Sequence, residues 1–135
     1  MPEIKGSCRC GKVSYQSSAE PVFTGVCHCR NCQKQTGSAF NVVVAVPSPS
    51  LKISGALTRY DSVGDSGKPT HGGFCPSCGS TITGEADVMP DITMLLAGTL
   101  DDPSWVTPTM QIYCDSAQPW VSLGGELQSF PKMPG

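Results

Sequence analysis

The stretch Phe74-Cys75-Pro76-Ser77-Cys78-Gly79 carries the strongest structural signal of this 135-residue sequence, because its two cysteines are separated by two residues. A tetrahedral zinc ion takes sulfur ligands at about 2.3 Å, so two cysteines that share one ion must lie close together. Pro76 fixes its own φ for a turn, and Gly79 can take a positive φ directly after the second cysteine. The stretch therefore predicts a zinc knuckle in which turned backbone amides donate to the sulfurs.

One knuckle supplies only two ligands, so a closed site needs a second pair of cysteines. Cys8-Arg9-Cys10-Gly11 offers such a pair with one intervening residue. If this segment is a strand, the two cysteine side chains point to the same face. We expect one structural zinc ion held by four cysteines, namely Cys8, Cys10, Cys75 and Cys78. The alternative is that the two pairs belong to different ions or to disulfides.

A third motif, Cys27-His28-Cys29-Arg30-Asn31-Cys32, provides three thiolates within six residues. Three protein ligands leave one tetrahedral position open, and this distinguishes catalytic from structural zinc. A soft exchangeable ligand such as a substrate thiol would suit a thiolate-rich ion. We expect a catalytic and labile zinc ion at Cys27, Cys29 and Cys32, with Cys32 in the first turn of a helix whose dipole favours its thiolate.

Three other residues are weaker candidates for metal ligands. His28 could close the three-cysteine site, although its ring should point away from an ion that both of its neighbours bind. His71 lies four residues before Cys75, but a histidine in a loop is more often simply exposed. Cys114 stands alone, and a single cysteine in a strand is usually a small buried hydrophobe.

The spacing of the eight cysteines favours metal over disulfides, since seven of them lie in the close-spaced motifs. Disulfide frameworks usually scatter their cysteines so that each bridge closes a long loop. Residues 1–15 contain no apolar segment of the kind found in signal peptides, and the apolar run at residues 40–46 is too short to span a membrane. We therefore expect a cytoplasmic protein without a membrane segment; a secreted disulfide protein is the alternative.

The composition indicates a mainly β domain that spans residues 1–135. Fifteen glycines and 12 prolines argue for many turns and against long helices. Only residues 30–36 have helical composition, with Gly37 placed to terminate the helix. The net charge of −2 lacks the basic excess that nucleic-acid binding usually needs. Alternating or β-branched segments predict strands at residues 11–15, 22–26, 40–46, 80–83, 92–100, 110–114 and 121–123, and a hairpin of residues 51–55 and 57–60.

The three cysteine motifs together resemble the glutathione-dependent formaldehyde-activating enzyme family, whose domain is shared by centromere protein V. The segments 6–15, 27–38 and 74–80 carry the resemblance, and the tail adds Trp105, residues 111–113, Trp120 and residues 130–131. The resemblance implies coiled antiparallel sheets with two zinc sites. By position it assigns Cys8, Cys10, Cys75 and Cys78 to the structural site and Cys27, Cys29 and Cys32 to the catalytic one.

The same resemblance implies an activity. The family's founding reaction joins formaldehyde to glutathione and gives S-hydroxymethylglutathione, which is classed with the carbon–sulfur lyases. We therefore expect a zinc-dependent enzyme whose partners are a small thiol such as glutathione and a small aldehyde. The rival interpretation is a non-catalytic zinc module that docks another protein, and it predicts a second site that is closed or empty.

Overall fold

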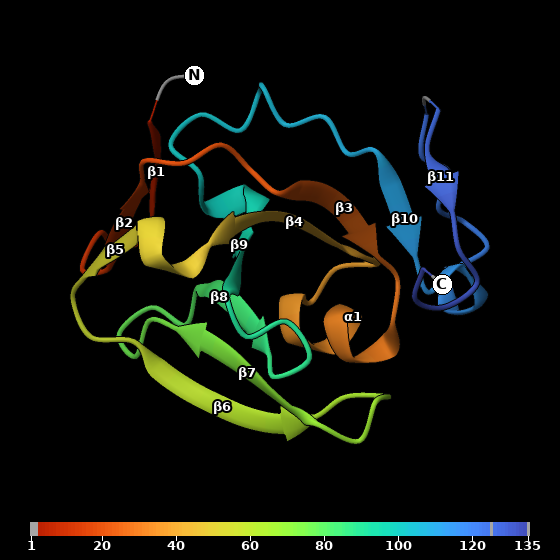
Figure 1. Ribbon diagram of the computed structural model, residues 1–135, viewed down its shortest axis with the longest axis horizontal. Helices are drawn as coiled ribbons and strands as arrows, with labels where there is room; N and C mark the ends of the chain where they lie inside the picture. Colours follow the sequence, from red (N-terminus) through yellow and green to blue (C-terminus); the bar gives the residue numbers. More distant parts are fainter. Residues whose placement is uncertain (1–2, 125, 135) are drawn as a thin grey trace.

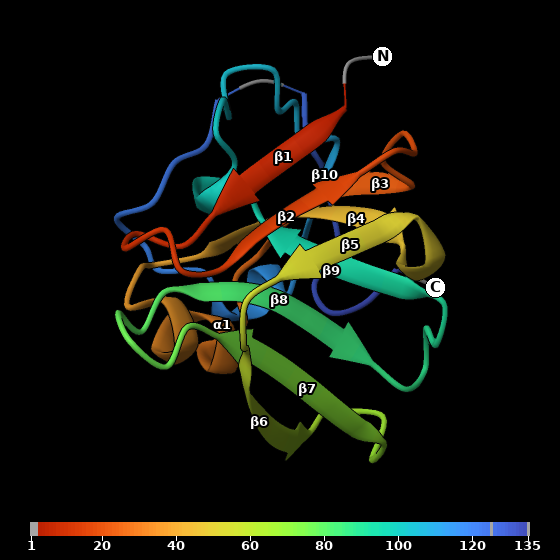
Figure 2. The same cartoon turned by 90° about the vertical axis from the view of Figure 1, so that its left-hand side faces the viewer.

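The computed structural model describes residues 3–124 and 126–134, and it consists mainly of two β-sheets. The smaller sheet has the strand order β1-β2-β5 and is antiparallel throughout. Its strands are β1 (Ile4–Ser7), β2 (Ser14–Ser17) and β5 (Leu51–Ser54). In Figure 2 this sheet lies in front of the larger one.

The larger sheet has the strand order β11-β10-β3-β4-β9-β8-β7-β6. Its pairings are antiparallel except at one edge, where β10 runs parallel to both β3 and β11. Its strands are β3 (Phe23–Cys27), β4 (Asn41–Pro47), β6 (Thr58–Val63), β7 (Pro69–Phe74), β8 (Thr81–Ala86), β9 (Ile92–Leu96), β10 (Met110–Ile112) and β11 (Gln128–Ser129). Short 3₁₀ turns follow β4, β9 and β10, namely η1 (Ser48–Ser50), η2 (Ala97–Thr99) and η3 (Cys114–Ser116).

The single α-helix among the described residues, α1 (Arg30–Thr36), connects β3 to β4. It ends at Gly37, whose φ of 72° allows its N–H to bond the carbonyl of Gln33. In Figure 1 the helix lies between β4 and β7, on the concave side of the curved larger sheet. Gly72 of β7 faces the end of the Gln35 side chain of α1, with 2.6 Å between the position of a Cβ on Gly72 and Nε2 of Gln35.

The core lies between the two sheets. Side chains of the smaller sheet, such as Ile4 and Tyr15, meet residues of the larger sheet, such as Val44, Ile82 and Leu95. Burial of such side chains is the main source of folding free energy. Two cysteines, Cys8 and Cys75, belong to the same buried cluster, so their thiol groups form part of the core.

The structure confirms the mainly β class, the two-sheet arrangement and the helix at residues 30–36. The predicted hairpin of residues 51–55 and 57–60 is wrong, because β5 pairs with β2 and β6 pairs with β7. Residues 121–123 form no strand, and residues 97–99 of the predicted strand 92–100 form the turn η2. Three strands were not predicted at all, namely β1, β7 and β11. Within the described ranges, no helix has the length and apolar character required to cross a membrane.

Candidate metal centres

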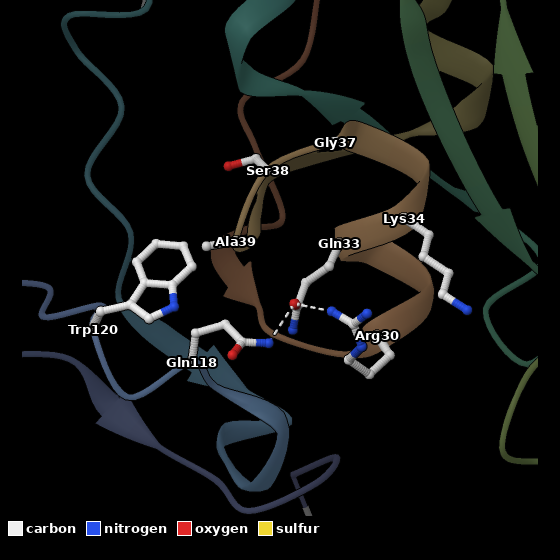
Figure 3. A pocket seen from close by; sticks show the side chains of 8 residues that line it. All are labelled: Arg30, Gln33, Lys34, Gly37, Ser38, Ala39, Gln118 and Trp120. Atoms are coloured by element: carbon white, nitrogen blue, oxygen red, sulfur yellow. Dashed lines mark hydrogen bonds between the residues drawn. The ribbon is translucent and has the colours of Figure 1, made fainter.

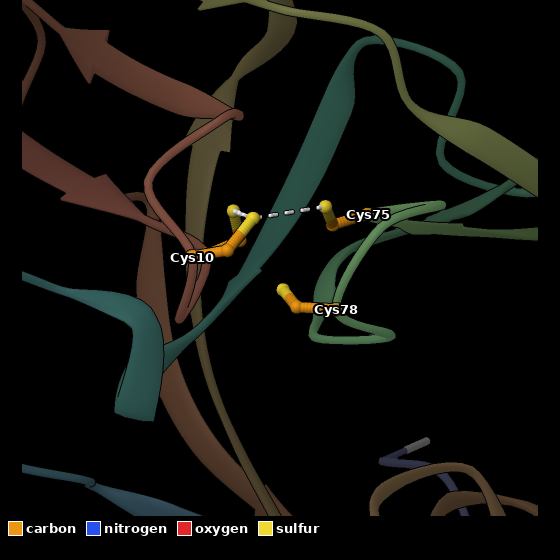
Figure 4. A group of neighbouring side chains, drawn as sticks. Cys10, Cys75 and Cys78 are labelled. Carbon is orange, nitrogen blue, oxygen red and sulfur yellow. Dashed lines mark hydrogen bonds between the residues drawn. The ribbon is translucent and has the colours of Figure 1, made fainter.

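The sulfur atoms of Cys8, Cys10, Cys75 and Cys78 lie within 4.8 Å of one another. Sγ of Cys10 is 3.6 Å from Sγ of Cys8 and 3.7 Å from Sγ of Cys75. Four ligands at about 2.3 Å around a tetrahedral zinc ion would be about 3.8 Å apart. In Figure 4 the Cys10 side chain points toward Cys75 and Cys78 on the facing loop. The donor set and its spacing therefore fit a zinc ion.

Each cysteine pair lies in a tight turn closed by a glycine. Gly11 has a φ of 82° and donates its N–H to the carbonyl of Cys8, while Gly79 has a φ of 77° and donates to the carbonyl of Cys75. Backbone N–H groups also approach the sulfurs, as from Val13 to Cys8 at 3.3 Å. The expected strand at the first pair is thus replaced by a second knuckle, because β1 ends at Ser7.

Contacts between the two knuckles hold them together. The Arg9 N–H donates to Oγ of Ser80 at 3.0 Å, and Nζ of Lys12 donates to Oγ of Ser77 at 3.4 Å. Oγ of Ser80 lies 3.2 Å from Sγ of Cys78 and lowers the pKa of that thiol. The Lys12 ammonium, held at Ser77 of the facing knuckle, offsets part of the negative charge that clustered thiolates would carry.

The second cluster, Cys27, Cys29 and Cys32, also has its sulfur atoms within 4.8 Å of one another. Cys27 ends β3, Cys29 is the N-cap of α1, and Cys32 lies in the first helical turn. The Cys32 N–H donates to Sγ of Cys29 at 3.3 Å. Three soft donors so close together suit a thiophilic ion and leave one tetrahedral position for an outside ligand.

Hydrogen bonds from Cys27 and Cys32 hold the pKa of Cys29 far below its ordinary value. The same contacts raise the pKa of Cys27 and of Cys32, since one negative charge disfavours a second beside it. The predicted low pKa therefore falls on Cys29 and not on Cys32. The backbone amides of Asn31 and Cys32 in the first helical turn make a smaller contribution in the same direction, as expected for a side chain at the N-cap.

His28 and Cys114 lie outside both sulfur clusters. His28 is buried, its Nε2 is 2.8 Å from Oε1 of Gln111, and its Nδ1 has no hydrogen-bond partner. Sγ of Cys114 contacts the carbonyl of Gln111 at 3.6 Å. The structure thus brings the seven motif cysteines into two clusters and leaves His28, after β3, and Cys114, in η3, in contact with Gln111 of β10.

His71 is held by carboxylates on both sides and does not approach a cysteine cluster. Its Nδ1 is 2.7 Å from Oδ1 of Asp61, and its Nε2 is 2.9 Å from Oδ1 of Asp87. Only the protonated ring can donate to both carboxylates, so this arrangement favours the charged form of His71. The two carboxylates raise the pKa of His71, and His71 in turn lowers the pKa of Asp61.

A cavity of about 240 Å³ opens beside Cys29. Four segments form its walls: the start of α1, the turn between β6 and β7, residues 113–116 around η3, and residues 131–132. The lining residues are Cys29, Arg30, Asn31, Asp65, Tyr113, Asp115, Ser116, Pro131 and Lys132. Arg30 and Asn31 lie within the Cys27–Cys32 motif, and Tyr113 and Pro131 lie in the tail segments that carry the resemblance, but only the cysteine was assigned a functional role from the sequence.

Tyr113 is the one non-glycine residue with positive φ within the described ranges, at 55°. This conformation ends β10 and turns the chain into η3. Partial burial raises the pKa of Tyr113 to about 12, with further contributions from a hydrogen bond to Asp65 and from the nearby sulfurs of Cys27 and Cys29. The phenol therefore keeps its proton and lies within the electrostatic reach of the three-cysteine cluster.

Gln33 connects the helix to the C-terminal segment. Its Nε2 donates to the carbonyl of His28 at 2.6 Å and to that of Ser116 at 3.1 Å. Its Oε1 accepts from Arg30 and from Nε2 of Gln118, the latter at 2.9 Å. Figure 3 shows this amide between Arg30 and Gln118, beside a second hollow of about 330 Å³ that reaches the exposed Trp120.

Comparisons with known proteins agree with this architecture. A family model described as "Glutathione-dependent formaldehyde-activating enzyme" matches residues 3–116. A protein of Emericella nidulans named "Putative glutathione-dependent formaldehyde-activating enzyme" is 28% identical over 90 residues, which make up 65% of this chain and 45% of that protein. The chain therefore matches less than half of the length of this curated relative.

Among solved structures, a Rhodobacter sphaeroides protein has a similar fold. Its TM-score is 0.58 at 22% sequence identity, and the match covers 77% of this chain and 91% of that one. At this level of identity the likeness concerns the fold alone.

Proposed function

The chain belongs to the glutathione-dependent formaldehyde-activating enzyme family, and from that premise we propose that it is a zinc-dependent enzyme of the carbon–sulfur lyase type. Its substrates would be a small thiol, such as glutathione, and formaldehyde or a related aldehyde, joined as a hydroxyalkyl thioether. The observation that carries the proposal is the three-cysteine cluster beside an open cavity.

In this proposal the two clusters have different roles. Cys8, Cys10, Cys75 and Cys78 would hold a structural zinc ion, because two of them are buried in the core and four sulfurs complete a tetrahedron. Cys27, Cys29 and Cys32 would hold the catalytic ion. When bound there, zinc would supply Lewis acidity that lowers the pKa of an incoming thiol.

The chain's own residues would bind and orient the two reactants. The cavity beside Cys29 is lined by the cations Arg30 and Lys132 and by the carboxylates Asp65 and Asp115. Glutathione carries both an ammonium group and carboxylates, so a cavity with both signs of charge suits it. Holding thiol and aldehyde together in one cavity would by itself accelerate their addition.

The proposal extends to the setting in which the enzyme works. Clusters of free cysteines are typical of reducing compartments, which supports a cytoplasmic location. We further propose that residues 1–135 act as one domain, because the four-cysteine cluster connects the smaller sheet to the larger one.

The proposal is tested by measuring the number of zinc ions bound per chain. The protein is purified under reducing conditions and measured before and after dialysis against glutathione. We expect two zinc ions per chain before dialysis and one afterwards. We also expect the protein to raise the rate of exchange between formaldehyde and glutathione, measured by NMR, above the spontaneous rate. A Cys29→Ser variant should start with one zinc ion that does not respond to glutathione. Two inert ions and an unchanged exchange rate would instead favour a non-catalytic module.

A further inference from the structure

The parallel pairing of β10 with β3 carries Tyr113 to the three-cysteine cluster. Ile112 is the register partner of Cys27, and the N–H of His28 donates to the carbonyl of Ile112 at 3.1 Å. Tyr113 therefore follows β10 at the point where Cys27 ends β3. Tyr113 and Cys29 line the same cavity.

The backbone of Tyr113 is fixed on both sides. Its N–H donates to the carbonyl of Lys132 at 3.2 Å, and its carbonyl accepts from the N–H of Ser116 at 3.0 Å. The neighbouring amides of Cys114 and Asp115 bond the carbonyls of Phe130 and Pro131 in the same way. These bonds fix the direction in which the Tyr113 side chain leaves the backbone, so no backbone ordering is needed when a ligand binds.

The phenol differs from the other polar groups of the cavity. Asp65 and Asp115 accept hydrogen bonds when ionised, and Arg30 is already engaged by the carbonyl oxygen of the Gln33 side chain. Lys132 carries its charge on a flexible four-carbon stem. Tyr113 supplies a neutral O–H donor beside the Asp65 carboxylate, on a backbone whose position is fixed before the reaction. A donor placed before the reaction stabilises developing negative charge effectively.

We propose that Tyr113 is a catalytic residue that donates a hydrogen bond to the oxygen atom of the thiol–aldehyde adduct. The inference rests on the proposed function. In the forward direction the thiol loses its proton, its sulfur lone pair forms the C–S bond, and the carbonyl π pair becomes an alkoxide. The proton released by the thiol returns to that oxygen through solvent, so that thiol and aldehyde give the hydroxyalkyl thioether without a further reactant. The hydrogen bond from Tyr113 strengthens as charge grows on the oxygen.

The test measures binding of two stable probes to the zinc-loaded full chain by calorimetry. S-(2-hydroxyethyl)glutathione carries a hydroxyl where S-propylglutathione carries a methyl group. We expect the wild type to bind the hydroxyl probe about fivefold to tenfold more tightly, as one hydrogen bond provides. Tyr113→Phe should remove this preference with unchanged zinc content. Tyr60→Phe, at an exposed tyrosine of β6, should keep it.

Turnover gives the second readout and separates the two proposals. We expect Tyr113→Phe to lower kcat about 10²-fold with little change in KM, as for loss of one oxyanion donor. The assignment of Tyr113 is overturned if Tyr113→Phe still prefers the hydroxyl probe. It is also overturned if the wild type does not prefer that probe or binds neither probe. If the wild type in that case still turns over glutathione and formaldehyde, the proposed function stands and only this inference fails. If the wild type shows no turnover and its zinc does not respond to glutathione, the proposed function is wrong.

Discussion

Sγ of Cys10 lies 3.7 Å from Sγ of Cys75, although 65 positions separate the two residues in the chain. The contact joins the loop after β1 in the smaller sheet to the loop between β7 and β8 in the larger one. Cys75 is fully buried in the core that the two sheets share. A metal ion at this point would connect the two halves of the core.

The first prediction concerns this connection. Cys75→Ser should abolish the cooperative thermal transition, because structural zinc contributes about 10–16 kcal/mol in zinc-finger peptides and a whole domain is stable by only about 5–15 kcal/mol. Circular dichroism during heating measures the unfolding transition, and the number of zinc ions bound per chain is measured on the same protein. The control is Cys114→Ser, which lies outside both clusters. A melting temperature equal to that of the control would contradict a structural role.

The second prediction separates the two clusters. Cys32→Ser should lose one zinc ion and the activity but keep the cooperative transition, since its cluster lies at the start of α1 and outside the buried core cluster. The same thermal and zinc measurements apply. If Cys32→Ser and Cys75→Ser unfold to the same extent, the division into structural and catalytic sites is wrong.

The third prediction concerns Gln33, whose side chain makes four hydrogen bonds in a buried position. Gln33→Met should lower the free energy of unfolding by about 2–4 kcal/mol, because it removes four hydrogen bonds and leaves the buried carbonyl of His28 and the part-buried carbonyl of Ser116 without their donor. Urea denaturation measures the change. Gln16→Met, at an exposed position of β2, serves as the control and should stay within about 0.5 kcal/mol of the wild type.

The fourth prediction concerns pH. The pKa of His71 is raised by Asp61 and Asp87, so the stability that this histidine contributes is present below the unfolded pKa of about 6.5 and is lost as pH rises through the folded pKa. Arg59, beside Asp61, opposes the shift, and Glu85 is the register partner of His71 on β8. His71→Gln should therefore lower the melting temperature more at pH 5.5 than at pH 9.

On the acid side the sign is opposite. The pKa of Asp61 is lowered chiefly by His71, so its contribution is present above the unfolded pKa of about 3.9 and is lost as pH falls through the folded value. The coupling between Asp61→Asn and His71→Gln in a double-mutant cycle should be largest near pH 5–6. A coupling that does not change with pH would show that the pair is not ionic.

The fifth prediction concerns Gly6 of β1. A Cβ at this position would overlap the hydroxyl of Tyr15 and the backbone carbonyl oxygen of Thr99. Gly6→Ala should therefore lower the free energy of unfolding by about 3 kcal/mol, as overpacking of a core does. Gly98→Ala is the matched control, because the space around a Cβ there is open within 4 Å. Equal effects of the two substitutions would mean that the smaller sheet can shift.

The parts of the structure that local sequence determines could be predicted. The knuckle at residues 74–79 follows from two cysteines, a proline and a glycine, and α1 follows from seven helix-compatible residues that end at Gly37. Both features depend on backbone conformations that neighbouring residues set. The juxtaposition of Cys8 with Cys75 followed from the need of a metal for four ligands, and not from any sequence periodicity.

Strand pairing could not be predicted in the same way, because it depends on contacts between distant segments. Residues 51–60 have the pattern of a hairpin, yet Gly55, with a φ of 95°, packs against the carbonyl of Lys12 and the chain passes from one sheet to the other. Strand β7 was missed because Pro69, Gly72 and Gly73 lower its β-propensity. The residues that line the cavity could not be predicted either, because Asp65, Tyr113 and Lys132 come from three separate segments of the chain.

Backbone hydrogen bonds between residues 113–115 and 130–132 join the end of the family match to a segment outside it. The family match ends at residue 116, so it includes the seven motif cysteines but not Pro131 and Lys132, which line the cavity. Substitutions in this part of the chain can alter the cavity and leave both cysteine clusters intact. We therefore expect substitutions at Pro131 and Lys132 to change which ligands the cavity beside Cys29 accepts without changing the zinc content.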